Sequence, residues 1–159
     1  MTAARSPRSA QLTLSVQYAV SANGKPTRAQ FRQWVRAALE HDARVTLRIV
    51  GQVEGRALNR TFRNKDYATN VLTFVMRKTP HFEGDLALCA PVVAREARAQ
   101  KKSLAAHYAH LTVHGVLHLQ GYDHENDAAA QIMEAREAQI MAILGYADPY
   151  QPVATYRSA

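Results

Sequence analysis

The stretch from His114 to His124 constrains the fold of this chain more than any other segment. His114 and His118 are four residues apart, so on a helix their imidazoles project from the same face, one turn from each other. Gly121 can adopt the left-handed conformation that ends a helix, and a reversed chain can then bring His124 back toward the other two. Three neutral imidazoles with one open position are typical of a catalytic zinc site. We therefore predict that His114, His118 and His124 bind one zinc ion per chain.

The alternative is that these histidines lie on a helix face and a turn and bind nothing. Metal binding is favoured because 7 histidines in 159 residues would produce this spacing by chance in only about one chain in a hundred. Two earlier histidines, His107 and His110, are expected to pack beside the site without binding the ion. Three imidazoles also suit nickel, copper or cobalt, and zinc is preferred for its availability and its tetrahedral open site.

The motif also matches the metzincin protease pattern H-E-x-x-H-x-x-G-x-x-H at every position but one. Where the proteases have a glutamate that deprotonates the attacking water, this chain has Gly115, which has no side chain to act as a base. Peptide hydrolysis by that route is therefore not expected. A metal-dependent hydrolase acting on another substrate stays an alternative.

The pattern of apolar residues predicts a strand-rich first half of the chain followed by a helical second half. Strands are expected at 11–20, 44–50, 71–76 and 85–89, and helices at 27–40, 51–62, 91–101, 103–119 and 127–144. Thr27, Ser103 and Asp127 are suitable N-caps, and Gly145 is a suitable C-terminal stop. This order favours an α+β fold with one mixed sheet of about four strands, helices packed against it, and the metal site at the end of a central helix.

Length and composition fit one domain over residues 1–150, because 159 residues with 47% hydrophobic content can bury a core. Residues 151–159 are expected to form a C-terminal tail, after a loop that begins at Asp148. The single cysteine, Cys89, lies in an apolar run and is expected in the core of a protein from a reducing compartment. The sequence contains no apolar run of about 18 residues and no secretory signal, so we expect a cytoplasmic protein without a membrane partner.

Positive charge is concentrated in the first 65 residues. Residues 1–65 contain 12 Lys and Arg against 3 Asp and Glu, a balance of +9, and residues 66–159 contain 8 against 10, a balance of −2, which together give the net +7. Lysines and arginines release condensed counterions from a phosphate backbone, so this distribution favours a polyanionic partner, with solubility as the alternative. We expect the basic side chains of residues 28–65 to line one groove beside the histidines.

Two further patterns accompany the histidine motif. The pattern R-x-K-D-x-x-T-N-V-L-x-F begins at Arg63, and G-D-L begins at Gly84. Together with the histidines and the glycine between them, these residues resemble the bacterial YbeY family of metal-dependent endoribonucleases over residues 40–150. The chain departs from the family where Ala68, Thr73 and Val75 replace a more common Pro, Ser and Pro, and none of these three is a candidate ligand.

The resemblance implies an α+β metalloprotein that cuts single-stranded RNA with one zinc ion held by the three histidines. It further implies a role in ribosomal RNA processing, including maturation of the 16S rRNA 3′ end, and in ribosome quality control. The implied partners are rRNA and the small ribosomal subunit with its proteins, and DNA is not expected. A rival hypothesis is a ribosome-assembly factor that contains zinc and binds rRNA without cutting it.

Outside the ligands, Arg63 corresponds to the family's functionally important arginine. Its chemistry agrees, because a guanidinium can hold a phosphate by two hydrogen bonds and stabilise the charge that grows on it, although a surface arginine after a helix is the plain alternative. Lys65 is a second candidate for phosphate binding. Asp123 either orients a histidine or caps the next segment. Glu134 and Glu137 on the last helix could face the site, but solvated charges are the more common case for helical carboxylates and are expected here. The nucleophile stays open between a water activated by the metal and the 2′-OH of the RNA.

Overall fold

The computed structural model describes residues 9–151. The first eight residues of the predicted domain, and residues 152–159 of the predicted tail, lie outside this range. The elements follow in the order β1 Leu12–Tyr18, α1 Arg28–Ala38, β2 Ala43–Val50, α2 Gln52–Arg63, β3 Val71–Arg77, β4 Phe82–Cys89, α3 Ala90–Ala99, α4 Leu104–Leu119 and α5 Asp127–Ile143.

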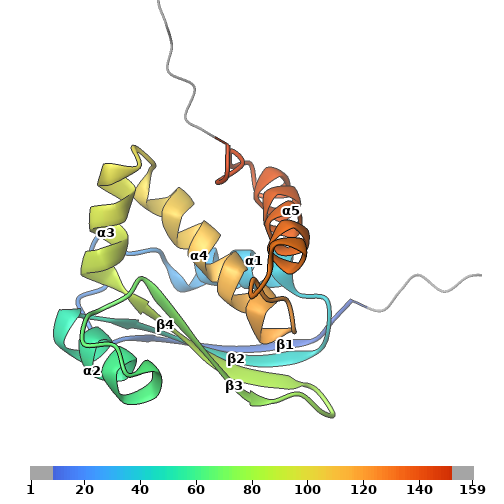
Figure 1. The fold of residues 1–159 in the computed structure, drawn as a ribbon, viewed down its shortest axis with the longest axis horizontal. Coiled ribbons are helices and arrows are strands. Elements are labelled where there is room, and N and C mark those ends of the chain that lie inside the picture. Colours follow the sequence, from blue (N-terminus) through green and yellow to red (C-terminus); the bar gives the residue numbers. More distant parts are fainter. Residues whose placement is uncertain (1–8, 152–159) are drawn as a thin grey trace, which may run out of the picture.

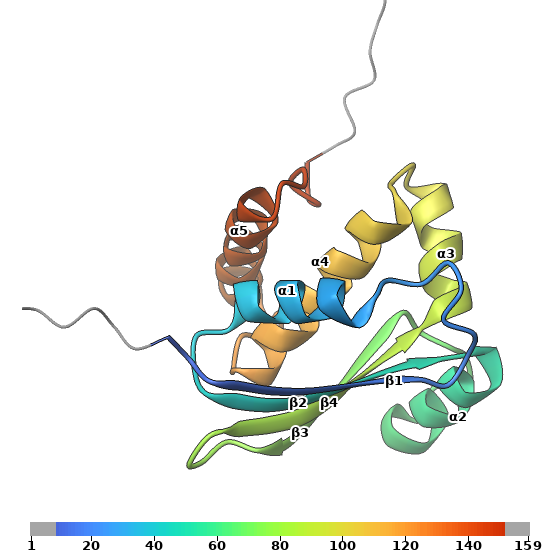
Figure 2. The same cartoon turned by 180° about the vertical axis from the view of Figure 1, so that it is seen from behind.

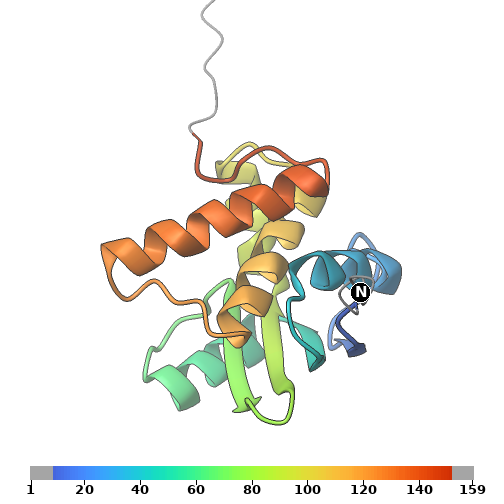
Figure 3. The same ribbon diagram turned by 90° about the vertical axis from the view of Figure 1, so that its right-hand side faces the viewer.

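The four strands form one mixed sheet in the order β1-β2-β4-β3 (Figure 1). β1, β2 and β4 are parallel neighbours, and β3 pairs antiparallel with β4 at the edge of the sheet. Figure 3 shows the β3–β4 hairpin beneath the C-terminal end of α4. The architecture is the predicted single-domain α+β fold, and it leaves β3 as an edge strand beside the helix that carries the histidines.

α1 and α4 cover one side of the sheet, and α2 lies on the other (Figures 1 and 2). α5 forms an outer layer that packs on α4 and α1. The core between the sheet and these helices includes the aromatic rings of Phe31, Trp34 and Tyr108, in which Phe31 meets the other two edge-on at centroid distances of 5.4 and 6.0 Å. Cys89 is buried, as predicted. No helix within residues 9–151 is both long and apolar enough to cross a membrane.

Local signals in the sequence explain most helix ends. Thr27 caps α1 in a reciprocal capping box, and the Ser103 hydroxyl accepts a hydrogen bond from a backbone N–H of α4. Gly145 has a φ of 89°, which suits the predicted stop after α5. The prediction at the start of α5 is wrong by one residue, because the side chain of Asn126 provides the cap and Asp127 is the first helical residue.

α4 approaches the sheet closely because it has a glycine where it faces β4, and β4 has a glycine where it faces α4. A Cβ on Gly115 of α4 would overlap the side chain of Leu86 on β4, whose Cγ would lie at 2.9 Å. A Cβ on Gly84 of β4 would overlap the side chain of Leu119 and would lie 2.5 Å from the carbonyl oxygen of Phe74. Such contacts leave no room for a side chain. The close approach sets the last two turns of α4 directly over β4 and beside the edge strand.

Candidate functional site

Each of the two helical histidines of the motif has its Nδ1 within hydrogen-bond distance of an oxygen atom. His114 Nδ1 lies 2.8 Å from the Oε1 carboxylate oxygen of Glu137, and His118 Nδ1 lies 2.9 Å from the backbone carbonyl oxygen of Tyr122. A carbonyl oxygen can only accept, so His118 donates through Nδ1–H and its Nε2 carries a lone pair. The same arrangement at His114 leaves a lone pair on its Nε2. Histidine ligands of metals usually donate their other ring N–H in this way.

The chain reverses after α4 as the sequence predicts. Gly121 has a φ of 106°, a left-handed conformation that favours glycine. The loop that follows returns the exposed ring of His124 to 5.5 Å from the ring of His114 and 6.0 Å from that of His118, measured between centroids. Three imidazoles separated by 4 and 6 residues in the sequence therefore gather at the end of α4.

The donor set suits a zinc ion, and one of the two ring separations is slightly wide for it. With Zn–N bonds near 2.1 Å, two imidazoles on one tetrahedral ion have centroids about 5.3 Å apart, so the pair of His114 and His124 fits and the pair of His118 and His124 is slightly wide. Among residues 9–151, no three His, Cys, Asp or Glu side chains are already drawn together closely enough to enclose an ion. His124 is exposed on a loop, so it is the ring that can move to complete the set. The residues fit zinc in their chemistry and in the free Nε2 atoms of the two helical rings.

The expectation that Glu137 is a solvated charge is wrong, because its side chain is completely buried. Besides the contact with His114, its carboxylate lies 3.2 Å from His110 Nε2 and accepts a hydrogen bond of 2.6 Å from the Tyr150 hydroxyl. Burial alone would raise the pKa of Glu137, but the hydrogen bonds from His110, His114 and Tyr150 outweigh it and lower the pKa to about 2. Glu137 is therefore a carboxylate at neutral pH, held against one of the candidate ligands.

Sequence reasoning also missed Tyr150, which falls in the segment expected to be a loop from Asp148 onward. The turn at 148–151 brings its hydroxyl to Glu137, and burial together with that hydrogen bond raises its pKa. A signal for Glu137 exists in the sequence. It lies on the same stripe of α5 as the buried residues Met133, Ile140 and Met141, and a carboxylate on an apolar stripe needs a partner inside the protein.

His107 and His110 pack beside the candidate ligands, as predicted. His107 is buried, and its Nε2 lies 2.9 Å from a carboxylate oxygen of Glu96, which also accepts a hydrogen bond from the amide of Asn70. Burial lowers the pKa of His107. The ring of His110 lies between those of His107 and His114, at centroid distances of 6.5 and 6.4 Å. The two residues connect the histidine cluster to α3 and to the start of β3.

A cleft of about 580 Å³ joins the histidines to the edge strand and to the end of α2. The side chains that line it come from three parts of the chain: Phe62 and Arg63 from α2, residues 71–76 of β3, and His114, His118, Asp123, His124 and Glu125 from α4 and the following loop. Arg63 is exposed and forms no ion pair with any carboxylate in the described part of the chain. A free guanidinium and three imidazoles thus face one cavity.

Lys65 and Asp123, the two further site predictions, differ in their position relative to the cleft. Lys65 is exposed beyond Asn64, which ends α2 in a left-handed conformation, and the lining of the cleft on this segment stops at Arg63. Asp123 lines the cleft, and its Oδ1 accepts a hydrogen bond of 3.2 Å from the backbone N–H of Glu125. That contact corresponds to the capping role for Asp123, one of the two left open by the sequence.

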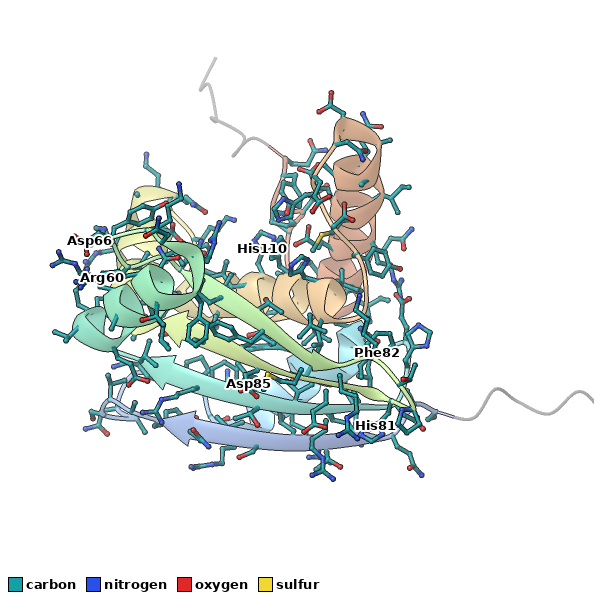
Figure 4. All side chains as sticks on the ribbon, turned by 60° about the horizontal axis from the view of Figure 1, so that its bottom comes forward. Arg60, Asp66, His81, Phe82, Asp85 and His110 are labelled. Carbon is teal, nitrogen blue, oxygen red and sulfur yellow. The ribbon has the colours of Figure 1, made fainter. Side chains whose placement is uncertain are left out.

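The prediction of a single basic groove is wrong. Arg28 and Arg32 lie beside β1, at the edge of the sheet opposite to β3. Arg48 and Arg56 form ion pairs with carboxylates at 2.6 and 2.8 Å. Figure 4 shows Arg60 next to Asp66, the carboxylate that pairs with Arg56, on the α2 side of the molecule. Of the basic residues between 28 and 65, only Arg63 lines the cleft, because α1 and α2 lie on opposite sides of the sheet and β2 runs through its middle.

Comparison with known proteins identifies relatives over most of the chain. A family profile described as "Endoribonuclease YbeY" matches residues 16–145. The protein named Endoribonuclease YbeY from Nitrosospira multiformis is 57% identical over 159 aligned residues, covering 91% of this chain and 84% of that protein. The protein of the same name from Methylobacillus flagellatus is 56% identical over 140 residues, covering 88% of this chain and 94% of that protein.

Among solved structures, the solution structure of TM1509 from Thermotoga maritima is similar in fold. It superposes with a TM-score of 0.57 at 22% sequence identity, and the alignment covers 87% of this chain and 99% of that one. The two chains share the arrangement of the sheet and helices at a level of identity that supports the fold alone.

Proposed function

This chain belongs to the YbeY family of endoribonucleases, and we propose that it cuts single-stranded RNA in the cleft beside β3, with one zinc ion held by His114, His118 and His124. The observation that carries the proposal is the meeting of Arg63 with the three histidines in one cavity, although they come from separate parts of the chain. Cleavage of an RNA phosphodiester is favoured by a cationic group that contacts the non-bridging oxygens and by a second electrophile on the same phosphate. This cleft offers the residues for both.

Arg63 binds the scissile phosphate. Its guanidinium presents a planar set of N–H donors that can contact two phosphate oxygens together, and it stays charged at any physiological pH. Because no carboxylate in residues 9–151 pairs with it, binding a phosphate does not require an internal ion pair to break. Negative charge grows on the phosphate oxygens during cleavage, so the contact strengthens as the reaction proceeds.

The histidines and the groups behind them hold the electrophile in place. Zinc, when bound, acts as a Lewis acid on a phosphate oxygen or lowers the pKa of a water molecule. His118 keeps its proton on Nδ1 through the Tyr122 carbonyl, and His114 keeps its proton on Nδ1 through Glu137. Both rings therefore present an unprotonated Nε2 to the cleft. The negative charge of Glu137 also makes His114 a stronger donor.

Two nucleophiles are compatible with this cleft, namely water and the 2′-OH of the RNA. Gly115 excludes the glutamate base of metzincin proteases on steric grounds as well, because a Cβ there would overlap the side chain of Leu86. The product ends distinguish the two routes. A 2′,3′-cyclic phosphate requires attack by the 2′-OH, whereas direct attack by water gives a phosphate monoester and also occurs on a strand that lacks the 2′-OH.

The substrate we propose is ribosomal RNA in the cytoplasm, cut during maturation of the 16S rRNA 3′ end and in ribosome quality control, with the small ribosomal subunit as partner. The family resemblance supports this part of the proposal. The competing function is a ribosome-assembly factor that binds rRNA without cutting it, and an assay of cleavage separates the two.

Purified protein incubated with single-stranded rRNA fragments tests the proposal. We expect cleavage by the wild type and its loss in Arg63→Ala and in His114→Ala, each compared with Arg60→Ala as a matched loss of one arginine from the same helix. Equal cleavage by all four proteins would indicate a contaminating nuclease and would overturn the enzymatic proposal. Binding of rRNA by the wild type without any cleavage would favour the assembly factor.

A further inference from the structure

Phe62 is a large apolar side chain in an unusual place. It occupies the last turn of α2 directly before Arg63, and 62% of it is exposed to solvent. Its ring meets that of Phe74 on β3 edge-on, with centroids 4.9 Å apart and an interplanar angle of 67°. Both rings line the cleft that contains the histidines. An aromatic pair with one open ring is therefore fixed beside the candidate phosphate-binding residue.

This pair does not serve the core. Phe74 faces the side of the sheet away from α4, because its neighbour across the β3–β4 pair is Asp85 and the flanking Gly84 and Leu86 face α4. Val75 and Met76, the next residues on β3, are also exposed in the same cleft, at 42% and 66%. Aromatic rings that remain in water at a cleft wall commonly bind a ligand with an apolar face.

We propose that Phe62, supported by Phe74, forms a stacking subsite for one unpaired nucleobase next to the phosphate bound by Arg63. The proposal rests on the proposed function, since it names how the same cleft selects its substrate. Every base has a π-face that can stack on an aromatic side chain, whereas both faces of a base within a duplex are already covered by its neighbours. The subsite thereby gives the cleft a preference for single strands without reading a particular sequence.

The position of the pair favours a nucleobase over a protein partner. Phe62 and Arg63 are consecutive residues that line one cavity with the three histidines, so a chain that places a phosphate at Arg63 has its adjoining nucleoside within reach of Phe62. The edge contact with Phe74 restrains the Phe62 ring, which lowers the entropy cost of binding a flat group. A surface that binds a protein partner would have no need to adjoin the residue that contacts the phosphate.

Tyr67 provides a matched control in the same region. It is 55% exposed, close to the exposure of Phe62, and it is not among the residues that line the cleft. The variants to compare are therefore Phe62→Ala, Phe62→Leu and Phe62→Tyr, with Tyr67→Ala as the control. Leucine keeps an apolar side chain without a ring, and tyrosine keeps the ring.

The test titrates each protein into a short single-stranded 2′-O-methyl RNA that contains 2-aminopurine, whose fluorescence is quenched by stacking. We expect quenching with the wild type and with Phe62→Tyr, and affinity lower by about 5- to 150-fold in Phe62→Ala. Phe62→Leu should bind weakly and without quenching, and Tyr67→Ala should match the wild type. Melting temperatures of all variants establish that each is folded.

The outcomes separate this proposal from the proposed function. If the wild type cuts single-stranded RNA but Phe62→Ala and Phe62→Leu bind and quench like the wild type, the stacking subsite is wrong and the nuclease stands. If Phe62→Ala loses binding and quenching while no protein cuts RNA, the subsite stands and the nuclease proposal falls. Equal affinity of Phe62→Leu and the wild type for this RNA would contradict stacking, because leucine has no ring.

Discussion

Nδ1 of His114 lies 2.8 Å from a carboxylate oxygen of Glu137, a residue of α5 that has no solvent exposure. The two residues are 23 positions apart in the chain, and only the packing of α5 on α4 brings them together. The contact fixes which nitrogen of His114 carries the proton. Through this contact, a residue outside the histidine motif supports one of the candidate zinc ligands.

Replacement of Glu137 by Gln should weaken zinc binding by about 10- to 100-fold, the usual effect of losing such an outer contact. Glutamine has the same shape but no charge, so it makes His114 a weaker donor. Competition between the protein and a chromophoric chelator measures the zinc affinity directly, without reference to RNA cleavage. Glu134→Gln, a partly exposed carboxylate on the same helix, is the control and should leave the affinity unchanged. Identical affinities for both variants would contradict the role of Glu137.

Replacement of Gly115 by Ala should destabilise the protein by about 1–3 kcal/mol, the usual cost of overpacking a core. The added Cβ overlaps the side chain of Leu86, which is fully buried. The sign of the change in the free energy of unfolding is informative, because in an unhindered helix the replacement of Gly by Ala stabilises by up to about 1 kcal/mol. Urea denaturation followed by circular dichroism measures the difference. A more stable Gly115→Ala protein would show that α4 does not approach the sheet this closely.

Arg63→Ala should reduce the rate of RNA cleavage by about 100-fold or more, as for the loss of one donor to a developing negative charge. Arg63→Lys should recover only part of this loss, because an ammonium keeps the charge but not the planar pair of donors. Initial rates on one RNA substrate give both values. Arg60→Ala removes an arginine one turn earlier on α2, outside the cleft lining, and should cut RNA at close to the wild-type rate.

Stability should fall at alkaline pH because of Tyr108, which is 1% exposed and whose pKa is raised by burial to about 12. The unfolded chain ionises this hydroxyl near pH 10, so the stabilisation is fully present below pH 10 and is lost as the pH rises to 12. The loss amounts to about 2–3 kcal/mol. Denaturation curves at pH 9 and 12 measure it. Tyr108→Phe should show a smaller decrease, and an equal decrease in both proteins would assign the effect to other groups.

The sequence was sufficient to predict features encoded by local spacing. The two helical histidines, the reversal at Gly121 and the cap at Thr27 each depend on a few neighbouring residues, and the structure has all three. The order of the elements likewise predicted the α+β class, because all the strand patterns precede residue 90 and the last three segments have the helical period.

Features that depend on packing between distant elements were missed. Glu137 was predicted to be solvated because most helical carboxylates are, and its burial depends on partners from α4 and the turn at 148–151. The basic groove was inferred from the net charge of a segment, but that segment contributes one edge strand, a central strand and helices on both sides of the sheet, so its charges do not point to one place. The role of Phe62 was not foreseen, since only the fold brings it to Phe74.

The most direct test of the central claim is removal and return of the metal. Wild-type protein stripped with a chelator should lose its cleavage of single-stranded RNA and regain it on addition of about one equivalent of zinc, whereas His114→Ala and His118→Ala should not respond to zinc at that concentration. Full cleavage by the stripped wild-type protein, with zinc content verified by elemental analysis, would contradict a zinc-dependent site at these histidines.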